Sequence, residues 1–207
     1  MQYKAATGLR AAVCAVLVMM SQGIGAQPDA HVPAGEAREV MQWVTTTGDH
    51  KGKPFAIVDK KQARLYVFDA QGRLAGASDA LIGSTAGDHS VPGVGARAQL
   101  GEVGLDERTT PAGRFDSIPG TNLSGEHVVW ADHATAFAIH RLRPGRAYKV
   151  RLERLATTTP EDNRVSFGCV VVPELFYTQV VQAVLGNSRG VVYVLPETRP
   201  VNELFGA

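Results

Sequence analysis

The chain has 207 residues, of which 44% are hydrophobic, with 21 basic residues, 20 acidic residues and two cysteines. A length near 200 favours one domain, or two at most, and suffices to bury a core without disulfides or metal ions. The balanced charge excludes the broad basic surface that nucleic acids or anionic membranes attract. We therefore expect no nucleic-acid partner.

Residues 1–26 have the three-part layout of a secretory signal peptide. Lys4 and Arg10 form a basic region, residues 11–20 are an unbroken apolar run, and small residues precede a cleavage site after Ala26. The run is too short to span a bilayer comfortably. We expect an exported protein of the periplasm or cell envelope with no membrane span after cleavage, the alternative being an uncleaved N-terminal anchor.

Cleavage after Ala26 changes the cysteine count and the charge. Cys14 lies in the apolar run and is lost, as are Lys4 and Arg10, so 19 basic residues against 20 acidic ones leave a charge of −1. Cys169 then remains as the single cysteine. A lone cysteine in an exported protein is either buried and inert or a reactive thiol.

After residue 26 the chain begins with a linker and a short helix, over residues 27–53. The helix is predicted over 36–44, where apolar residues recur at helical spacing. Strands at 55–58 and 64–68 form a hairpin, and residues 74–82 continue as an extended segment. Residues 86–108 are rich in Gly and short polar residues and predict a long loop.

The second half of the chain continues with short strands, predicted at 114–118, 128–130 and 136–142, while 148–152 fits a strand or a helix. Pro173 begins the clearest helix, which Gly186 ends. Residues 190–196 form a last buried strand, and 198–207 form a C-terminal tail. Short strands with few helices predict a mainly β (α+β) domain over residues 54–197.

Ser166-Phe167-Gly168-Cys169 is the segment most suggestive of chemistry. Because the predicted helix begins at Pro173, its positive end would favour a Cys169 thiolate. Gly168 lets the backbone approach a carbonyl closely, and N–H groups there could hold an oxyanion. A cysteine nucleophile needs a base, and His140 is the nearest histidine in sequence and ends a strand-like run. The alternative is a buried cysteine with a structural histidine.

These residues together resemble the catalytic domain of the L,D-transpeptidase (YkuD) family. That family's signature is an isolated histidine followed by a Ser-His-Gly-Cys run, matched here by His140 and residues 166–169. Residues 110–115 (Thr-Pro-Ala-Gly-Arg-Phe) match an earlier segment, and the ordered combination is more specific than the cysteine motif alone. The resemblance covers roughly residues 54–196 and implies a β-sandwich with a few short helices.

The resemblance implies an exported cysteine acyltransferase acting on peptidoglycan tetrapeptide stems. The cysteine attacks the L-to-D amide bond, forms a thioester and releases D-alanine. A second stem's amine then takes the acyl group in a 3→3 cross-link or a related exchange. Carbapenem-type β-lactams are the implied inhibitors, and neither a cofactor nor a metal ion is implied.

The resemblance also assigns roles by position in the motif. Cys169 corresponds to the nucleophile and His140 to the general base and acid. The backbone carbonyl of Arg141 corresponds to the group that orients His140. Gly168 corresponds to the oxyanion-side backbone, and Ser166 to a supporting position.

Three features depart from the family pattern. Phe167 replaces the second histidine, Val171 stands where an arginine is common, and the 29 positions between His140 and Cys169 exceed the usual interval. We expect an inserted loop or hairpin over residues 141–164 bordering the cleft. Its further arginines would meet stem carboxylates or form a solvated face; they are Arg143, Arg146, Arg151, Arg154 and Arg164.

Two other functions stay open. One is a hydrolase of L,D-carboxypeptidase or amidase type, with water as the acceptor. The other is a catalytically silent cell-wall-binding domain, which the departures at Phe167 and Val171 would permit. His127 and His133 are spaced too widely from His140 for a typical zinc site and are expected at the surface or in the cleft.

Overall fold

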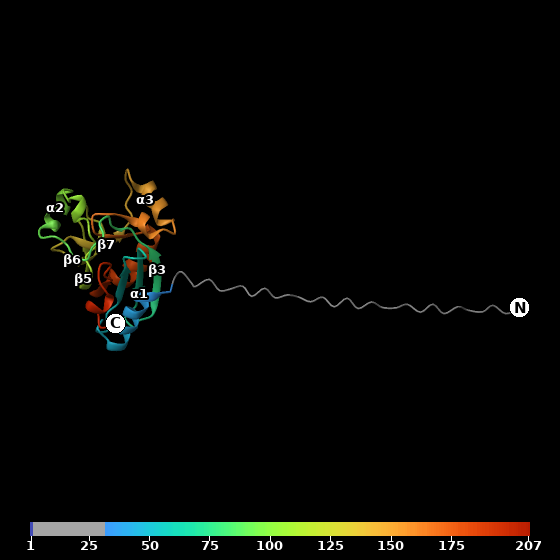
Figure 1. The fold of residues 1–207 in the computed structure, drawn as a ribbon. Coiled ribbons are helices and arrows are strands. Elements are labelled where there is room, and N and C mark those ends of the chain that lie inside the picture. Colours follow the sequence, from blue (N-terminus) through green and yellow to red (C-terminus); the bar gives the residue numbers. More distant parts are fainter. Residues whose placement is uncertain (2–31) are drawn as a thin grey trace. The chain divides into compact units, whose positions relative to one another are not determined.

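The computed structural model describes residue 1 and residues 32–207 (Figure 1). The predicted signal peptide and the first part of the predicted linker lie outside the described residues. His31–Ala207 form a single compact unit. Within residues 32–207, no helix has the length and apolar character needed to cross a membrane.

An eight-stranded sheet in the order β3-β2-β1-β10-β5-β6-β7-β9 is the frame of the fold. Its strands are β1 (Phe55–Asp59), β2 (Arg64–Phe68), β3 (Leu74–Asp79), β5 (Gly113–Thr121), β6 (His127–Asp132), β7 (Phe137–Arg141), β9 (Val170–Val172) and β10 (Gly190–Val194). A separate parallel pair joins β4 (Ile82–Gly83) to β8 (Arg164–Ser166). The predicted hairpin is β1–β2, in which Phe55 faces Phe68.

Strand β5 is shared by the two halves of the sheet. Its residues Gly113–Ser117 pair with β10, whereas Ile118–Thr121 pair with β6. Side chains from both halves meet in one core, for example Val58 and Val192 from one half and Ile139 from the other. The sheet therefore bends around this core, and the predicted mainly β (α+β) fold with short helices is confirmed.

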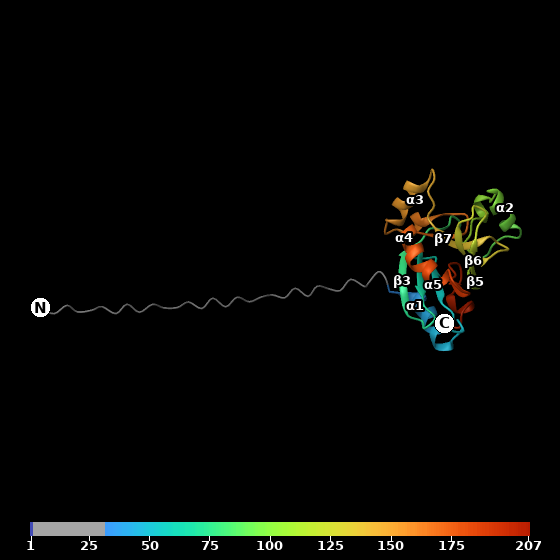
Figure 2. The ribbon, with the colours of Figure 1, turned by 180° about the vertical axis from the view of Figure 1, so that it is seen from behind.

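The helix that follows β9 fills the inner face. It runs without a break through α4 (Glu174–Phe176), a π-helical turn η3 (Tyr177–Val181) and α5 (Gln182–Leu185) (Figure 2). Pro173 is its N-cap and Gly186 its C-cap, as predicted. Tyr177, Val181 and Leu185 are buried in the core.

Helix α1 (Gly35–Thr47) covers the outer face. Its apolar stripe packs on β1 and β10 together with the C-terminal turn η4 (Val201–Glu203) and Phe205. Every residue of β1 and β10 is buried, so these central strands need cover on both faces. The helix expected within the linker and the residues expected as a tail supply that cover.

Two predicted irregular segments contain helices instead. The expected loop over 86–108 holds α2 (Val94–Leu100) and the 3₁₀ turn η1 (Leu105–Glu107), joined by an ion pair of 2.6 Å between Arg97 and Glu107. The expected inserted loop or hairpin holds α3 (Tyr148–Leu155) and η2 (Pro160–Asn163), so of the strand and the helix that 148–152 fitted, the structure has the helix. Figure 1 shows α2 and α3 at the same end of the sheet. Gly93 and Gly101, both in the left-handed region, flank α2, and its Ala, Arg, Gln and Leu residues favour a helix.

Candidate active site

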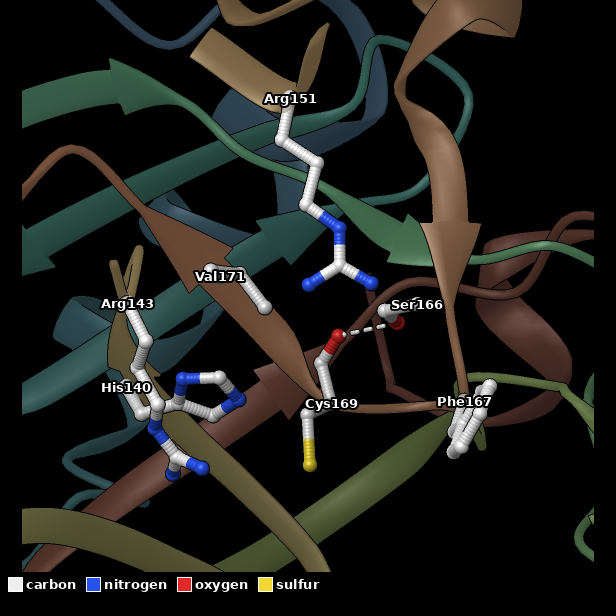
Figure 3. A pocket seen from close by; sticks show the side chains of 7 residues that line it. All are labelled: His140, Arg143, Arg151, Ser166, Phe167, Cys169 and Val171. Atoms are coloured by element: carbon white, nitrogen blue, oxygen red, sulfur yellow. Dashed lines mark hydrogen bonds between the residues drawn. The ribbon is translucent and has the colours of Figure 1, made fainter. Parts of the chain in front are cut away.

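The pairing of β7 with β9 brings His140 and Cys169 together. The two strands are parallel, with His140 opposite Val171, so Cys169 lies just before β9 and level with Ala138 of β7. Both side chains line one cavity (Figure 3). The two residues predicted as base and nucleophile, 29 positions apart in sequence, thus share a site.

A backbone hydrogen bond fixes the tautomer of His140. Its Nδ1 lies 2.8 Å from the carbonyl oxygen of Arg141, so Nδ1 carries the proton and donates it to that carbonyl. The other ring nitrogen, Nε2, is left as an acceptor. Burial, assisted by the charge of Arg143, lowers the pKa of His140 to about 4, which keeps the ring neutral at neutral pH.

The Cys169 thiol is held in its neutral form. Burial raises the pKa of Cys169 above its ordinary value, and this outweighs a backbone hydrogen bond from Ala138 and the charge of Arg143. The thiol also contacts the carbonyl oxygen of Ala136 at 3.4 Å. At neutral pH the site therefore holds a neutral thiol beside a neutral imidazole, and the sulfur becomes nucleophilic only as its proton leaves.

The predicted help from a helix N-terminus is wrong. Strand β9 separates Cys169 from α4, and three extended residues carry the chain about 10 Å away. The field of a helix terminus falls off within about one turn. Because that field does not reach the sulfur, burial decides the pKa of the thiol.

Ser166 closes the turn that presents the cysteine. Its Oγ donates to the carbonyl of Cys169 at 2.6 Å and accepts the N–H of Gly168 at 3.1 Å. The N–H of Gly168, predicted to face an oxyanion, is thus already occupied. Ser166 thus holds the backbone on either side of Cys169, and its supporting role at the site stays a prediction.

Both the backbone conformation at position 168 and the atoms around it require a glycine. Its φ of 128° lies in the region that favours glycine, and a Cβ there would sit 2.8 Å from the carbonyl oxygen of Thr109. The hydroxyl of Thr110 donates to the carbonyl of Gly168 and accepts the N–H of Gly83, each at 2.8 Å. Thr110 thereby ties the nucleophile's turn to strand β4.

Phe167 forms a wall of the cavity opposite His140, with Cys169 between them (Figure 3). Its ring is 42% exposed, and the guanidinium of Arg108 lies over it at 4.3 Å from the ring centre. This cation–π contact fixes an otherwise mobile aromatic ring at the rim. Val171 is buried and contributes an apolar floor.

Two of the five further arginines of the inserted segment reach the cavity, namely Arg143 and Arg151. Arg154 donates to the carbonyl of Asp162, and Arg164 pairs with Glu197. Arg146 is exposed and does not line the cavity. The alternative that these arginines form a solvated face therefore applies to some of the five and not to Arg143 and Arg151.

A second, larger lobe of about 560 Å³ begins at the same thiol, since His140, Arg143, Phe167 and Cys169 line both lobes. It extends beneath α2 and the β5–β6 turn, where Trp130 stacks on His133 with ring centres 4.6 Å apart. His127 lines neither lobe, because its Nδ1 is bound to the Tyr177 hydroxyl at 2.8 Å. Cys169 is thus the point where the two lobes meet.

Sequence reasoning missed two residues of the site. Thr110 belongs to the 110–115 segment that resembles the family, but this resemblance assigns its side chain no role of its own. Arg108 carried no signal, because its partner Phe167 lies 59 positions away.

No model of a protein family matches the chain, and no curated protein sequence does. Among solved structures, the chain is similar to the catalytic domain of the L,D-transpeptidase from E. faecium, with 18% identity, a TM-score of 0.33, and coverage of 70% of this chain and 98% of that one. It is also similar to the helical cell shape determining protein Pgp2 from Campylobacter jejuni, with 15% identity, a TM-score of 0.43, and coverage of 81% and 58%.

A third similar structure is the Ldtfm–avibactam carbamoyl enzyme, with 17% identity and a TM-score of 0.36. The alignment covers 70% of this chain but 49% of that one, so the chain spans about half the length of that protein. Structures similar to this fold thus include catalytic domains of L,D-transpeptidases, the family that the sequence motifs resemble.

Proposed function

We propose that the protein is an exported cysteine acyltransferase of the L,D-transpeptidase type, acting on peptidoglycan stem peptides. The observation that carries this proposal is the pairing of Cys169 with a neutral His140 in one cavity. The carbonyl of Arg141 holds Nδ1 of His140, which leaves Nε2 to accept the thiol proton. By the same reasoning, carbapenem-type β-lactams are expected to acylate Cys169.

In the proposed reaction the Cys169 sulfur attacks the carbonyl of the L-to-D amide as Nε2 of His140 takes the thiol proton. The backbone N–H of Cys169 stabilises the resulting oxyanion. Gly168 contributes through its conformation, because its own N–H is bound to Ser166. His140 then gives the proton to the leaving nitrogen, D-alanine departs, and a thioester remains.

The second half of the reaction transfers the acyl group. An amine of a second stem attacks the thioester carbonyl, His140 accepts a proton from that nitrogen, and the proton returns to the departing sulfur. The two lobes that Cys169 lines support transfer over hydrolysis, since a donor group and an acceptor group could approach the thiol from different sides. A catalytically silent binding domain would not need the hydrogen bond from Nδ1 of His140 that fixes the tautomer of the ring.

Purified protein incubated with tetrapeptide muropeptides tests the proposal, with products followed by mass spectrometry. We expect cross-linked dimers and free D-alanine, and an acyl-enzyme mass on Cys169. Tripeptide without dimer would instead indicate the hydrolase. Cys169→Ala and His140→Ala are expected to abolish product formation, and a Cys169→Ala variant as active as the wild type would refute the mechanism.

A further inference from the structure

The smaller lobe of the cavity is positively charged. Its volume is about 210 Å³, and two arginines but no acidic residue are among the seven residues that line it: His140, Arg143, Arg151, Ser166, Phe167, Cys169 and Val171. Figure 3 shows the Arg151 side chain extending from α3 toward Ser166 and Val171, with its guanidinium in the cavity. An anionic group of a ligand is what such a lobe would attract.

The two arginines differ in their partners. Arg143 pairs with Glu126, whose carboxylate also pairs with Arg141, at 2.5 and 2.6 Å respectively. The guanidinium of Arg151 has no ion pair and no hydrogen bond with any residue in 32–207, although the side chain is half-buried. Its charge nevertheless acts at the site, since it helps to lower the pKa of His140. Arg151 is therefore the cation of the lobe that is free to bind a ligand.

Helix α3 holds Arg151 firmly above the nucleophile. Tyr148 and Leu155 share the inward face of α3 with Arg151, at spacings of three and four residues. Both pack in a small apolar cluster with Leu81, Leu142 and Val171, and Val171 is two residues from Cys169. The guanidinium is thus placed relative to the thiol by a packed helix.

We infer that Arg151 binds a carboxylate of the peptide substrate beside the carbonyl that Cys169 attacks, and so determines specificity. This inference rests on the proposed function. Two carboxylates of a peptide can lie so close to the reacting carbonyl. One is the terminal carboxylate of the leaving residue, and the other is on the side chain of the residue that donates the acyl group. A planar guanidinium suits either, because it binds a carboxylate through two parallel hydrogen bonds.

Three tetrapeptides test the inference: one with both carboxylates free, one with a C-terminal carboxamide, and one with the side-chain carboxyl amidated. For each, kcat and KM for release of the last residue are measured. We expect amidation of the recognised carboxylate to lower kcat/KM roughly 30-fold in the wild type, mainly through KM. The amidated peptide that shows this loss identifies which carboxylate Arg151 binds.

Variants assign the effect to one side chain. Arg151→Gln is expected to process the acid and the amides equally, and Arg151→Lys to keep part of the preference. Arg146→Gln, which removes one exposed charge from the same segment, should behave as the wild type. The inference is wrong if Arg151→Gln retains the full preference for the acid.

Binding to the Cys169→Ala variant separates the inference from the proposed reaction, because this variant binds peptide without turnover. Calorimetric titration with the acid and the two amides should give a Kd ratio near 30 for one pair, and near 1 once Arg151→Gln is added. Absence of turnover in the wild type together with an intact Kd ratio would overturn the proposed reaction alone. Equal Kd values for all three peptides would overturn the role of Arg151.

Discussion

His140 and Cys169 line one cavity as two neutral groups. Burial is the main reason for both shifts, because it disfavours the charged forms of an imidazole and of a thiol alike. In the proposed reaction, attack would therefore couple bond formation to proton transfer instead of starting from a resting thiolate–imidazolium pair.

The pH dependence follows from the state of His140. The lowered pKa of about 4 means that the ring accepts a proton from the thiol at neutral pH, and loses this capacity as the pH falls through about 4. We expect kcat/KM for thioester formation to fall only below about pH 5, where an unshifted histidine would cause a decline near 6.5. Stopped-flow acylation across pH 3.5–8 measures this, and a midpoint at 6.5 would contradict it.

Gly168 is expected to tolerate no side chain. Gly168→Ala adds a Cβ at 2.8 Å from the Thr109 carbonyl oxygen in a backbone that disfavours L residues. We predict a loss of about 1–3 kcal/mol in the free energy of unfolding and at least a tenfold slower acylation. Gly145→Ala is the matched control, since Gly145 has a φ of 155° with nothing within 4 Å of the added atom. Equal effects in the two variants would show that the short distance between the added Cβ and the Thr109 carbonyl oxygen is not the reason for the loss.

Thr110 joins three elements at the scale of strands and turns. Its hydroxyl bridges the end of β4 and the turn before β9, and Thr110 lies three residues before the start of β5. The side chain is buried, so each lost hydrogen bond leaves an unsatisfied backbone group. Local turn propensity gives no hint of this link, which exists only once the three elements are packed together.

Thr110→Val removes both hydrogen bonds while preserving shape. We expect it to lower the free energy of unfolding by about 1–3 kcal/mol and to slow acylation by Cys169. Thr110→Ser, which keeps the hydroxyl, should restore most of the acylation rate. Urea denaturation and single-turnover acylation measure the two effects, and a Val variant with wild-type acylation would show that Thr110 does not position the turn.

Helix α3 decides between the strand and the helix that residues 148–152 both fitted. The residues form a helix within the expected loop or hairpin because Tyr148 and Leu155 have an apolar cluster to pack against. That cluster includes Leu81 and Val171, which are remote in sequence. The same packing turns Arg151 toward the cavity and leaves Arg146 outside it.

Across the whole molecule, a buried ionic network connects distant segments beneath the site. The Lys60 ammonium has no exposed surface and lies 2.8 Å from Asp88 and 3.5 Å from Glu197. It also donates to the carbonyl of Thr110 at 3.0 Å. Asp88 in turn accepts the N–H groups of Glu197 and Thr198. The segment after β10 is thereby joined to the β1–β2 turn and to the support of the nucleophile.

This network predicts sensitivity to acid. Burial alone would raise the pKa of Asp88, but hydrogen bonds from Lys60, Thr198 and the backbone outweigh it and hold the pKa well below its usual range. A depressed carboxyl pKa stabilises the fold above the unfolded value of about 3.9, and this contribution is lost as the pH falls below it. We expect Tm to decline steeply between pH 5 and pH 2.5.

Asp88→Asn should flatten that decline. The variant also leaves the Lys60 charge buried without its closest partner, which costs about 3–5 kcal/mol at pH 7. Thermal unfolding of both proteins at several pH values measures the two effects. An Asn variant with a slope as steep as the wild type would mean that other carboxylates govern the acid response.

The sequence by itself determined most strands, though not β8 and β9, together with the long helix and the candidate pair of Cys169 and His140. These follow from apolar periodicity, from turn residues such as those bounding β1 and β2, and from a motif in which the residue order carries the signal. Such signals are local and extend over a few residues, so they can be interpreted without knowing which elements pack together.

Only the tertiary structure decided the state and surroundings of that pair. The parallel pairing of β7 with β9 placed His140 beside Cys169. Burial by remote segments lowered the pKa of His140 and raised that of Cys169, and only the second shift runs against the direction that a helix terminus would have given. In the folded chain the N–H of Gly168 is bound to Ser166. Of the arginines of the insertion, Arg151 is brought to the cavity without an ion-pair partner. Burial, charge and cavity lining depend on neighbours far away in the sequence, which no local pattern encodes.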